Sequence, residues 1–371
     1  MRRVFCLPLG FLLVLLSGCA AINPYYDAGK SHHTPSGFRN RYADTVNKPF
    51  NDLLRWRWQA WRDDLPRPAG QPTPQQAANL ALIAETPTSA SPVAPPPRVT
   101  WIGHASVLIQ AGRLNVLTDP IFSDRASPVQ FLGPRRAQPP GLALNELPRI
   151  DVVLISHNHY DHLDTGSIQG LIALAAEKQQ PQPLFIVPLG QKTLLAGLGA
   201  TRVSELDWWD RLELEGTQFH FTPAQHWSAR GFGDRSQTLW GGFAVFAPGF
   251  HWFYSGDTGY SKDFADIRQH FAGLNGPRGF DLALLPVGAY EPRWFMKEQH
   301  VNPAEAVQIH RDLGAQRSLG VHWGTFALTD EPLDQPPRDL ANARAAAGLA
   351  EEEFFLMKIG ETRQLPARPA S

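Results

Sequence analysis

Cysteine is nearly absent from this chain of 371 residues. The two cysteines, Cys6 and Cys19, both lie within the first twenty residues, and the rest of the chain has none. No disulfide can therefore cross-link a folded core, and no thiolate can serve there as a nucleophile or a metal ligand. Any metal site in the body of the protein must use nitrogen and oxygen ligands.

An excess of positive charge is lacking as well. The 34 lysines and arginines are balanced by 35 aspartates and glutamates, which gives a formal net charge of −1. This balance offers no electrostatic case for binding nucleic acid. The hydrophobic content of 43% is ordinary for a globular protein, and the length suits one large domain with extensions or two modest domains.

The amino-terminal segment is typical of an exported protein. Two arginines precede an apolar run at 5–16 that is too short to span a bilayer comfortably. The following Leu-Ser-Gly-Cys at 16–19 resembles a bacterial lipoprotein box, so we expect residues 1–19 to be a lipoprotein signal peptide and Cys19 to be lipidated. Such an anchor would tether the protein to the cell envelope, facing the periplasm, and Ala20 favours the outer membrane. An ordinary signal peptide or an uncleaved anchor is the alternative.

Residues 20–97 are predicted to form an amino-terminal extension and a linker, because proline concentrates between 66 and 97. Within the extension, residues 52–62 have a helical pattern in which Leu54, Trp58 and Trp61 share one stripe. Tryptophan together with arginine suits a membrane interface. Packing of the stripe against the following domain is the alternative.

From residue 98 onward, short β-rich runs alternate with helical stretches. The pattern predicts strands at 99–102, 106–109, 114–118, 152–155, 184–187, 218–222, 242–246, 251–255, 282–285 and 318–321. It predicts helices at 164–176, 191–198, 263–271, 303–313 and 338–347. This order favours a mixed α/β (α+β) domain over 98–366, with two sheets sandwiched between helices.

Three imidazoles and a carboxylate lie within six residues, from His157 to His162, directly after the apolar run 151–155. In an extended segment His157 and His159 point the same way, whereas Asp161 and His162 need a turn to face a second point. One metal ion could not accept all four side chains from so short a stretch with good geometry, but two could. A pair of metals suits the hydrolysis of phosphate esters and related bonds.

Two metals need further ligands, and three later strand ends supply candidates. His226 follows a strand and a proline, and His322 follows a strand and precedes a glycine. Asp257 lies in a Gly-Asp-Thr-Gly segment, where small neighbours let a carboxylate approach and bridge two cations. Mixed α/β folds place their chemistry in strand-end loops on one rim, so we expect these residues to converge.

Taken together, these residues resemble the metallo-β-lactamase fold superfamily, and the chain is more similar still to the N-acyl-phosphatidylethanolamine-hydrolysing phospholipase D branch. The segments similar to that branch are 99–105, 118–122, 205–209, 288–296 and 322–327. The resemblance runs from about residue 98 to about residue 362. It implies a four-layer αββα sandwich that holds a dinuclear zinc centre.

The resemblance also implies roles for individual residues. One zinc would take His157, His159 and His226, the other Asp161, His162 and His322, and Asp257 would bridge them. Asp161 and Asp257 are the expected catalytic carboxylates, and Tyr160 and His300 match positions that contact the substrate. Manganese or iron can occupy similar nitrogen and oxygen sites.

Asp119 and His104 are candidates to support the ligand set. Asp119, at a strand end, can orient a ligand imidazole through its second nitrogen, or simply cap a turn. His104 is expected to be structural and within hydrogen-bond reach of the site. The aromatic and apolar side chains of Tyr290, Trp294, Phe295 and Met296 can line an acyl channel or pack in the core.

The activity implied by the resemblance is hydrolysis of a phosphodiester bond in a membrane phospholipid. A hydroxide activated by the two metals would attack phosphorus and release phosphatidic acid and an N-acylethanolamine. The exported amino terminus and the Pro-rich linker have no counterpart in that branch, so they leave the natural lipid open. The alternatives are a zinc-dependent lactonase or ester hydrolase of a small molecule, and an envelope lipoprotein that affects outer-membrane permeability.

Overall fold

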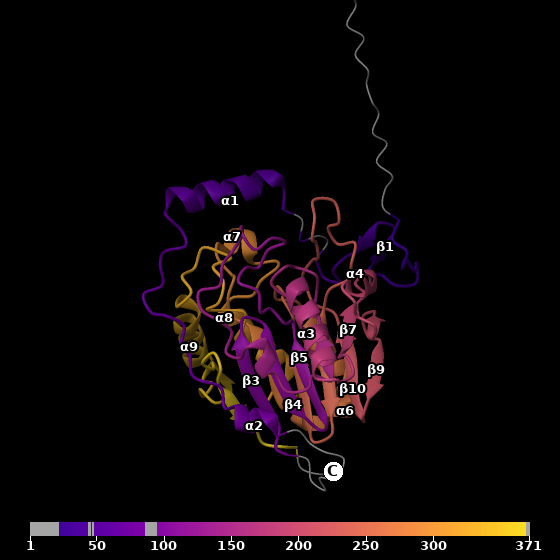
Figure 1. The fold of residues 1–371 in the computed structure, drawn as a ribbon. Coiled ribbons are helices and arrows are strands. Elements are labelled where there is room, and N and C mark those ends of the chain that lie inside the picture. The colour runs from indigo at the N-terminus through magenta and orange to yellow at the C-terminus, as the bar shows by residue number, and fades with distance from the viewer. Residues whose placement is uncertain (1–21, 44–45, 47, 86–94, 369–371) are drawn as a thin grey trace, which may run out of the picture.

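The structure, a computed structural model, describes residues 22–43, 46, 48–85 and 95–368 (Figure 1). The predicted signal peptide at 1–19 and the predicted lipidation site Cys19 lie outside these residues. Among the described helices, none combines the length and the apolar character needed to cross a bilayer.

Two mixed sheets of seven strands each form the centre of the described chain. The first has the order β16 (Thr362–Gln364), β3 (Arg98–Gly103), β4 (Ser106–Ala111), β5 (Leu114–Thr118), β6 (Val152–Leu154), β7 (Leu184–Pro188) and β8 (Val203–Leu206). The second has the order β15 (Phe354–Phe355), β14 (Ser318–Val321), β13 (Leu282–Pro286), β12 (Phe250–Tyr254), β11 (Gly242–Ala247), β10 (Thr217–Thr222) and β9 (Arg211–Leu214). In each sheet one half is antiparallel and the other half parallel.

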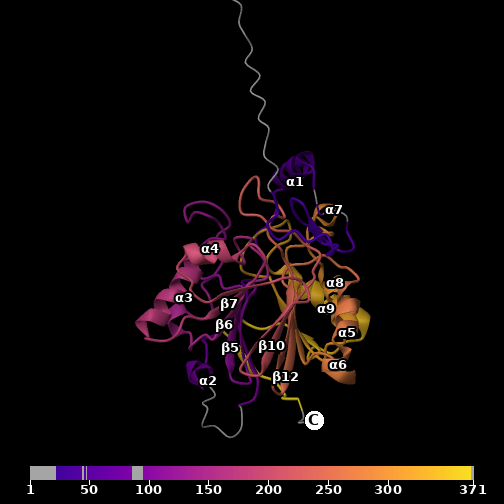
Figure 2. The same cartoon turned by 90° about the vertical axis from the view of Figure 1, so that its right-hand side faces the viewer.

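Helices cover the outer faces of both sheets, as Figure 2 shows. The first sheet is covered by α3 (Thr165–Glu177) and α4 (Lys192–Gly197), and the second by α5 (Asp263–His270), α8 (Pro303–Leu313) and α9 (Gln335–Ala347). The shorter elements are α2 (Leu80–Ala84), α6 (Ala272–Asn275), α7 (Arg293–Met296), the 3-10 turns Leu144–Glu146 and Gly276–Arg278, and the hairpin β1 (His33–Thr34) and β2 (Gly37–Phe38). The αββα sandwich expected from the sequence is confirmed.

The run Val107-Leu108-Ile109 within strand β4 is apolar because both faces of its sheet are covered. Val107 and Ile109 belong to the core between the two sheets, whereas Leu108 belongs to the core between the first sheet and its helices. Successive side chains of a strand point to opposite faces, and both faces of this sheet are covered. Both faces must therefore be apolar.

One buried carboxylate of the sandwich, that of Asp207, binds several side chains of the amino-terminal extension. Asp207 accepts hydrogen bonds from Lys30 Nζ at 2.6 Å, His32 Nε2 at 2.7 Å and His33 Nε2 at 2.9 Å. These groups hold the pKa of Asp207 well below its usual value, against the opposing effect of burial. The lysine already neutralises the carboxylate, so we interpret this cluster as a latch rather than a metal site.

The predicted helix of the extension is α1 (Phe50–Arg62), which lies above α7 in Figure 1. The stripe of Leu54, Trp58 and Trp61 is exposed by 51%, 55% and 80%, so it does not pack against the domain. The contact is instead made by Trp56, whose ring centroid lies 4.8 Å from that of Phe295. The packing alternative for the stripe is therefore wrong.

Candidate metal centre

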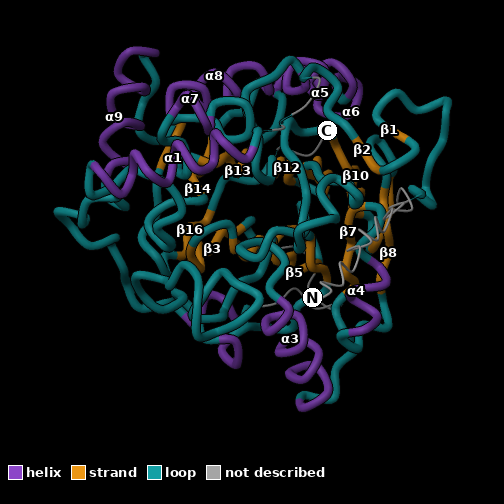
Figure 3. The backbone as a smooth tube through the Cα atoms, turned by 90° about the horizontal axis from the view of Figure 1, so that it is seen from above, coloured by secondary structure: helices purple, strands orange, loops and turns teal. Residues whose placement is uncertain are grey.

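The carboxyl ends of four strands deliver the predicted ligands to one region. His157 follows β6, His226 follows β10, Asp257 follows β12 and His322 follows β14. Figure 3 looks down on this end of the molecule, where loops surround the ends of both sheets. The convergence expected from the sequence is therefore present.

A tight turn separates the ligands that lie within 157–162. The backbone N–H of His162 donates to the carbonyl of His159 at 3.1 Å, and that of Leu163 donates to the same carbonyl at 2.9 Å. The guanidinium of Arg230 closes the loop from outside, because it donates to the carbonyls of Asn158 and Leu163 at 2.9 and 2.8 Å. The turn predicted between His159 and His162 is thus fixed by its own backbone hydrogen bonds and by the side chain of Arg230.

The first group of ligand atoms consists of three imidazole nitrogens. His159 Nδ1 lies 2.8 Å from His157 Nε2 and 3.4 Å from His226 Nε2. A tetrahedral zinc ion with ligands at about 2.0–2.2 Å separates its ligand atoms by roughly 3.3–3.6 Å. The spacing of 3.4 Å between His159 and His226 lies within that range, whereas the spacing of 2.8 Å between His157 and His159 is shorter than the range.

The second group combines imidazoles with a carboxylate. Asp161 Oδ2 lies 3.4 Å from His162 Nε2 and 3.3 Å from His322 Nε2. The two imidazole rings are nearly parallel, with centroids 5.1 Å apart. These three side chains bring their ligand atoms together at a second point.

Asp257 Oδ2 lies between the two groups. It is 3.1 Å from His162 Nε2 and 3.2 Å from His322 Nε2, and it is 3.9 Å from the Nε2 atoms of both His157 and His226. Gly256 makes this position possible: its φ is +60°, and a Cβ there would lie 2.6 Å from the Cβ of Ser156. One carboxylate oxygen therefore faces both ligand groups.

Hydrogen bonds to groups outside the cluster orient three of the imidazoles so that the Nε2 atom of each ring faces inward. His226 Nδ1–H donates to the carbonyl of Gln299 at 2.9 Å, and His162 Nδ1–H donates to Asp119 Oδ2 at 2.7 Å. His157 Nδ1 bonds the Ser156 hydroxyl at 2.9 Å, whose own proton goes to Asp119. With Nδ1 bonded in this way, Nε2 of each ring is the nitrogen that faces the site, and it is an acceptor wherever the ring is neutral.

The cluster contains buried polar atoms that no protein group satisfies. His162 Nε2 and Asp257 Oδ1, both in the cluster, have no hydrogen-bond partner among the described residues. Leaving such atoms buried and unpaired is costly, and functional sites are where they are found. Together with the donor spacing, this shows that the residues fit divalent metal ions.

Electrostatics in the cluster favour added positive charge. Burial lowers the pKa of both His159 and His226 to about 3, so these rings are neutral. Burial also acts to lower the pKa of His162, but Asp257 and Asp161 outweigh it and raise that pKa well above its usual value. The two carboxylates stay ionised, since His162 holds the pKa of each well below its usual range against the effect of burial.

Asp119 is the hub behind the second ligand group. Besides His162, its carboxylate accepts the backbone N–H of Ser156 at 2.7 Å and the hydroxyls of Ser156 and Tyr254. It is completely buried. The predicted contact of Asp119 with the second nitrogen of a candidate ligand imidazole is confirmed by this geometry.

His104 also reaches the site, at the turn between β3 and β4. Its Nε2 lies 2.9 Å from Asp161 Oδ2, and its ring centroid lies 4.0 Å from that of His322. The expected hydrogen-bond reach is confirmed. The nitrogen is also close enough to Asp161, His162 and His322 to belong to a metal-sized group, which spacing in the sequence did not reveal.

The two predicted substrate contacts lie at different places on the rim. His300 Nδ1 is 3.9 Å from Asp257 Oδ2 and has no hydrogen-bond partner among the described groups. The ring of Tyr160 lies 4.1 Å under the guanidinium carbon of Arg230, and its hydroxyl donates to the carbonyl of the same arginine. His300 is therefore free to bind a ligand, whereas Tyr160 is partly engaged by the protein.

Most of the predicted acyl-channel residues pack inside the protein. Phe295 and Met296 form a buried cluster with Trp56, and Tyr290 is buried with its hydroxyl bonded to Asp339. Trp294 alone of the four is exposed. The packing alternative therefore describes the other three.

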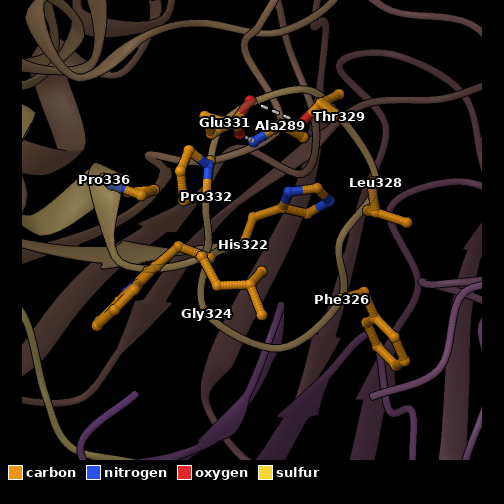
Figure 4. Close-up of a pocket in the computed structure, with 12 residues that line it drawn as sticks. Ala289, His322, Gly324, Phe326, Leu328, Thr329, Glu331, Pro332 and Pro336 are labelled. Carbon is orange, nitrogen blue, oxygen red and sulfur yellow. Dashed lines mark hydrogen bonds between the residues drawn. The ribbon is translucent and has the colours of Figure 1, made fainter. Parts of the chain in front are cut away.

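A small pocket behind His322 is closed by a buried carboxylate (Figure 4). Glu331 accepts the backbone N–H groups of Ala289, Tyr290 and Glu291 at 2.6, 3.2 and 3.0 Å, and the hydroxyl of Thr329 at 2.8 Å. Burial nevertheless raises the pKa of Glu331. These bonds fix the backbone that follows β13 against the loop that follows β14.

The extension contributes a residue that sequence reasoning did not find. Asn40 forms two hydrogen bonds with the backbone of His226: its Oδ1 accepts the N–H at 2.9 Å, and its Nδ2 donates to the carbonyl at 3.0 Å. Trp240 Nε1 donates to the same Oδ1 at 3.1 Å. A ligand loop of the sandwich is thus held by a side chain from 186 residues earlier.

Replacing Asn40 with alanine is expected to weaken metal binding by roughly 10–100-fold, the usual cost of losing an outer partner of a ligand. The reason is that the backbone of His226 loses its anchor while its imidazole is retained. Zinc titration against a competing chelator measures the change. Asn23→Ala is the matched control, because Asn23 bonds the carbonyl of Gly37 within the extension. Equal affinities of the two variants would contradict the role of Asn40.

Comparison with known proteins adds independent findings. A family model described as "Beta-lactamase superfamily domain" matches residues 114–323. The N-acyl-phosphatidylethanolamine-hydrolyzing phospholipase D 1 of Caenorhabditis elegans is 39% identical over 276 residues, which cover 71% of this chain and 74% of the worm protein. The mitochondrial protein of the same description from Saccharomyces cerevisiae is 37% identical over 269 residues, which cover 71% of this chain and 55% of the yeast protein.

Solved structures share the fold at low sequence identity. An isothiocyanate hydrolase from Delia radicum gut bacteria superimposes with a TM-score of 0.56 at 18% identity, covering 73% of this chain and all of that one (100%). A metallo hydrolase from Ignicoccus hospitalis superimposes with a TM-score of 0.50 at 17% identity, covering 72% of this chain and 98% of that one.

Proposed function

This chain belongs to the metallo-β-lactamase superfamily and is a metal-dependent hydrolase, and from that premise we propose that it cleaves N-acylated phosphatidylethanolamine in the manner of a phospholipase D. Two relatives at 39% and 37% identity carry that activity in their descriptions. The observation that carries the proposal is Asp257 Oδ2, which faces two groups of ligand atoms at once. A paired metal centre suits phosphodiester hydrolysis.

We further propose that the two metals are zinc ions. His157, His159 and His226 would hold one, Asp161, His162 and His322 the other, and Asp257 would bridge them. The donors are imidazole nitrogens and carboxylate oxygens, which zinc accepts readily, and the rings already present their lone pairs inward. Bound there, the pair would supply Lewis acidity toward a phosphoryl oxygen and a water whose pKa is lowered toward 7.

The chain's own groups would do the positioning. Asp257 and Asp161 stay ionised and fix the ligand rings, while Asp119 and Gln299 fix the tautomers behind them. His300 Nδ1, which has no partner among the described groups, can bond a phosphoryl oxygen of the substrate. In the reaction a water oxygen joins phosphorus, the bond from phosphorus to the ethanolamide oxygen breaks, and that oxygen takes up a proton.

The products define the test. Zinc-loaded protein incubated with N-acyl-phosphatidylethanolamine micelles in ¹⁸O-water should yield phosphatidic acid that carries ¹⁸O in its phosphate, and an unlabelled N-acylethanolamine. Mass spectrometry of both products checks this. Diacylglycerol as the product would show that the bond between phosphorus and the glycerol oxygen is cleaved instead, and this would refute the phospholipase D assignment. Hydrolysis of lactones or small esters with no attack on the lipid would favour the alternative hydrolase.

A further inference from the structure

The outer face of α1 is apolar although nothing described covers it. Phe50, Leu54, Trp58 and Trp61 follow one another at intervals of four, four and three residues, which places them on one side of the helix. All four are exposed. A surface helix normally turns its apolar side to the core, so a helix with large apolar groups on its outer side is typical of one that meets another apolar phase.

Two loop tips add to this apolar surface at the same end of the molecule. Phe131 and Leu132 are exposed at 82% and 68%, and Phe232 is fully exposed. The loops that carry them rise on the side of α1, as the purple and orange loops near the top of Figure 2 show. This is also the end at which the strands deliver the metal ligands. Three separate apolar projections therefore stand at the end of the molecule that carries the candidate site.

The inner face of α1 ties it to the rim of that site. Trp56 packs on Phe295 and its Nε1 donates to Asp330 at 2.9 Å. The guanidinium carbon of Arg55 lies 4.7 Å from the centre of the Trp294 ring, beside the same short helix α7. The exposed face of α1 is thus held rigidly next to the loop that leads to His300.

From these observations we propose that α1 and the two loop tips form a docking face for a bilayer of anionic phospholipid. The projections belong to separate elements, α1 and two loops, at one end of the molecule, which suits a fluid lipid surface better than a second protein. Tryptophan at the outer face with exposed arginines suits the boundary between acyl chains and headgroups. Within α1, Arg55, Arg57 and Arg62 outnumber the single acidic residue Asp52.

The predicted anchor agrees with this orientation. Cys19 precedes the first described residue, Ile22, by three positions, and three extended residues reach at most about 10 Å. The hairpin β1–β2 that follows lies at the same end of the molecule as α1 in Figure 1. The docking face deepens the proposed function and rests on it for its purpose, because a lipid hydrolase must meet its substrate at the bilayer.

Vesicle binding tests the proposal without requiring catalysis. The full chain carrying Cys19→Ala, so that no acyl chain contributes, is mixed with sucrose-loaded vesicles of phosphatidylethanolamine and phosphatidylglycerol and sedimented. Adding Leu54→Gln, Trp58→Gln and Trp61→Gln should lower the partition coefficient by roughly tenfold or more. The matched control is Leu80→Gln with Leu274→Gln, two exposed leucines of α2 and α6 at the opposite end. The control should bind as the parent does.

The outcomes separate docking from catalysis. Unchanged vesicle binding by the triple variant overturns the docking face. The docking face is also overturned if neither protein binds vesicles and the parent is a dimer that becomes monomeric in the triple variant. An unchanged melting temperature and zinc content of the triple variant shows that a loss of binding is not a loss of folding. Binding that depends on α1, in a parent that does not cleave N-acylated lipid, would support the docking face and refute the proposed substrate.

Discussion

Substituting Asp257 with asparagine is expected to lower metal-dependent hydrolysis by more than roughly 100-fold. Loss of an outer partner of a ligand typically costs 10–100-fold, and Asp257 Oδ2 faces both ligand groups directly. The amide keeps the shape but removes the negative charge that His162 and His322 face at 3.1 and 3.2 Å. We expect the bound zinc to fall from two ions to one or none.

Steady-state kinetics on the lipid and elemental analysis of the purified protein measure the two effects. Asp312→Asn is the control, because that carboxylate accepts from the hydroxyl of Tyr260 and the amide of Gln308 and bonds none of the candidate ligands. Full activity of Asp257→Asn would eliminate the bridging role. An intact cellular phenotype with the enzyme inactive would instead support the envelope lipoprotein without catalysis.

Asp119→Ala is expected to be the most destabilising change near the site, lowering the free energy of unfolding by roughly 3–5 kcal/mol in metal-free protein. The substitution leaves the buried N–H of Ser156, the hydroxyl of Tyr254 and the Nδ1–H of His162 without their acceptor. Since His162 also loses its orientation, zinc affinity should fall by roughly 10–100-fold.

Urea unfolding of chelator-treated protein measures the first effect and zinc titration the second. Asp119→Asn separates them, because the amide oxygen can still accept the N–H of Ser156 while the charge opposite His162 is gone. We expect the asparagine variant to keep more stability than the alanine variant. Equal free energies of unfolding for Asp119→Ala and the parent would show that the hydrogen bonds of Asp119 do not stabilise the fold.

The sequence predicted the central strands and main helices because their apolar runs are long and bounded by turn residues. The elements it missed are edge strands such as β9, where the sequence Arg-Leu-Glu-Leu at 211–214 is only half-buried, and β15 and β16 of two and three residues. Such strands are defined by the neighbour they pair with, and a single sequence does not show that neighbour.

The helical pattern of α1 predicted its existence but not which face would pack. Both faces carry large apolar residues, so periodicity gives no preference between Trp56 and the stripe that contains Trp58. The packing face is decided by Phe295 and Asp330, which lie more than two hundred residues later in the chain. That information is absent from the helix itself.

The candidate ligands were predictable because metal chemistry limits the residue types and the first four are adjacent. Asp119 was also predictable as a side-chain partner, whereas Asn40 and Gln299 were not, since their contacts involve backbone atoms. Asn40 bonds the backbone of His226, and Gln299 orients its ring through a carbonyl. No side-chain pattern encodes a carbonyl partner, so only the fold reveals it.

The bond from Asn40 to the loop of His226 has a consequence for anyone who would shorten this protein. A chain that begins at residue 98 would keep every predicted ligand. It would lose the two hydrogen bonds by which Asn40 holds the backbone of His226. We therefore propose that a minimal catalytic unit must begin upstream of Asn40, well before the first core strand, so that the extension keeps its contact with the His226 loop.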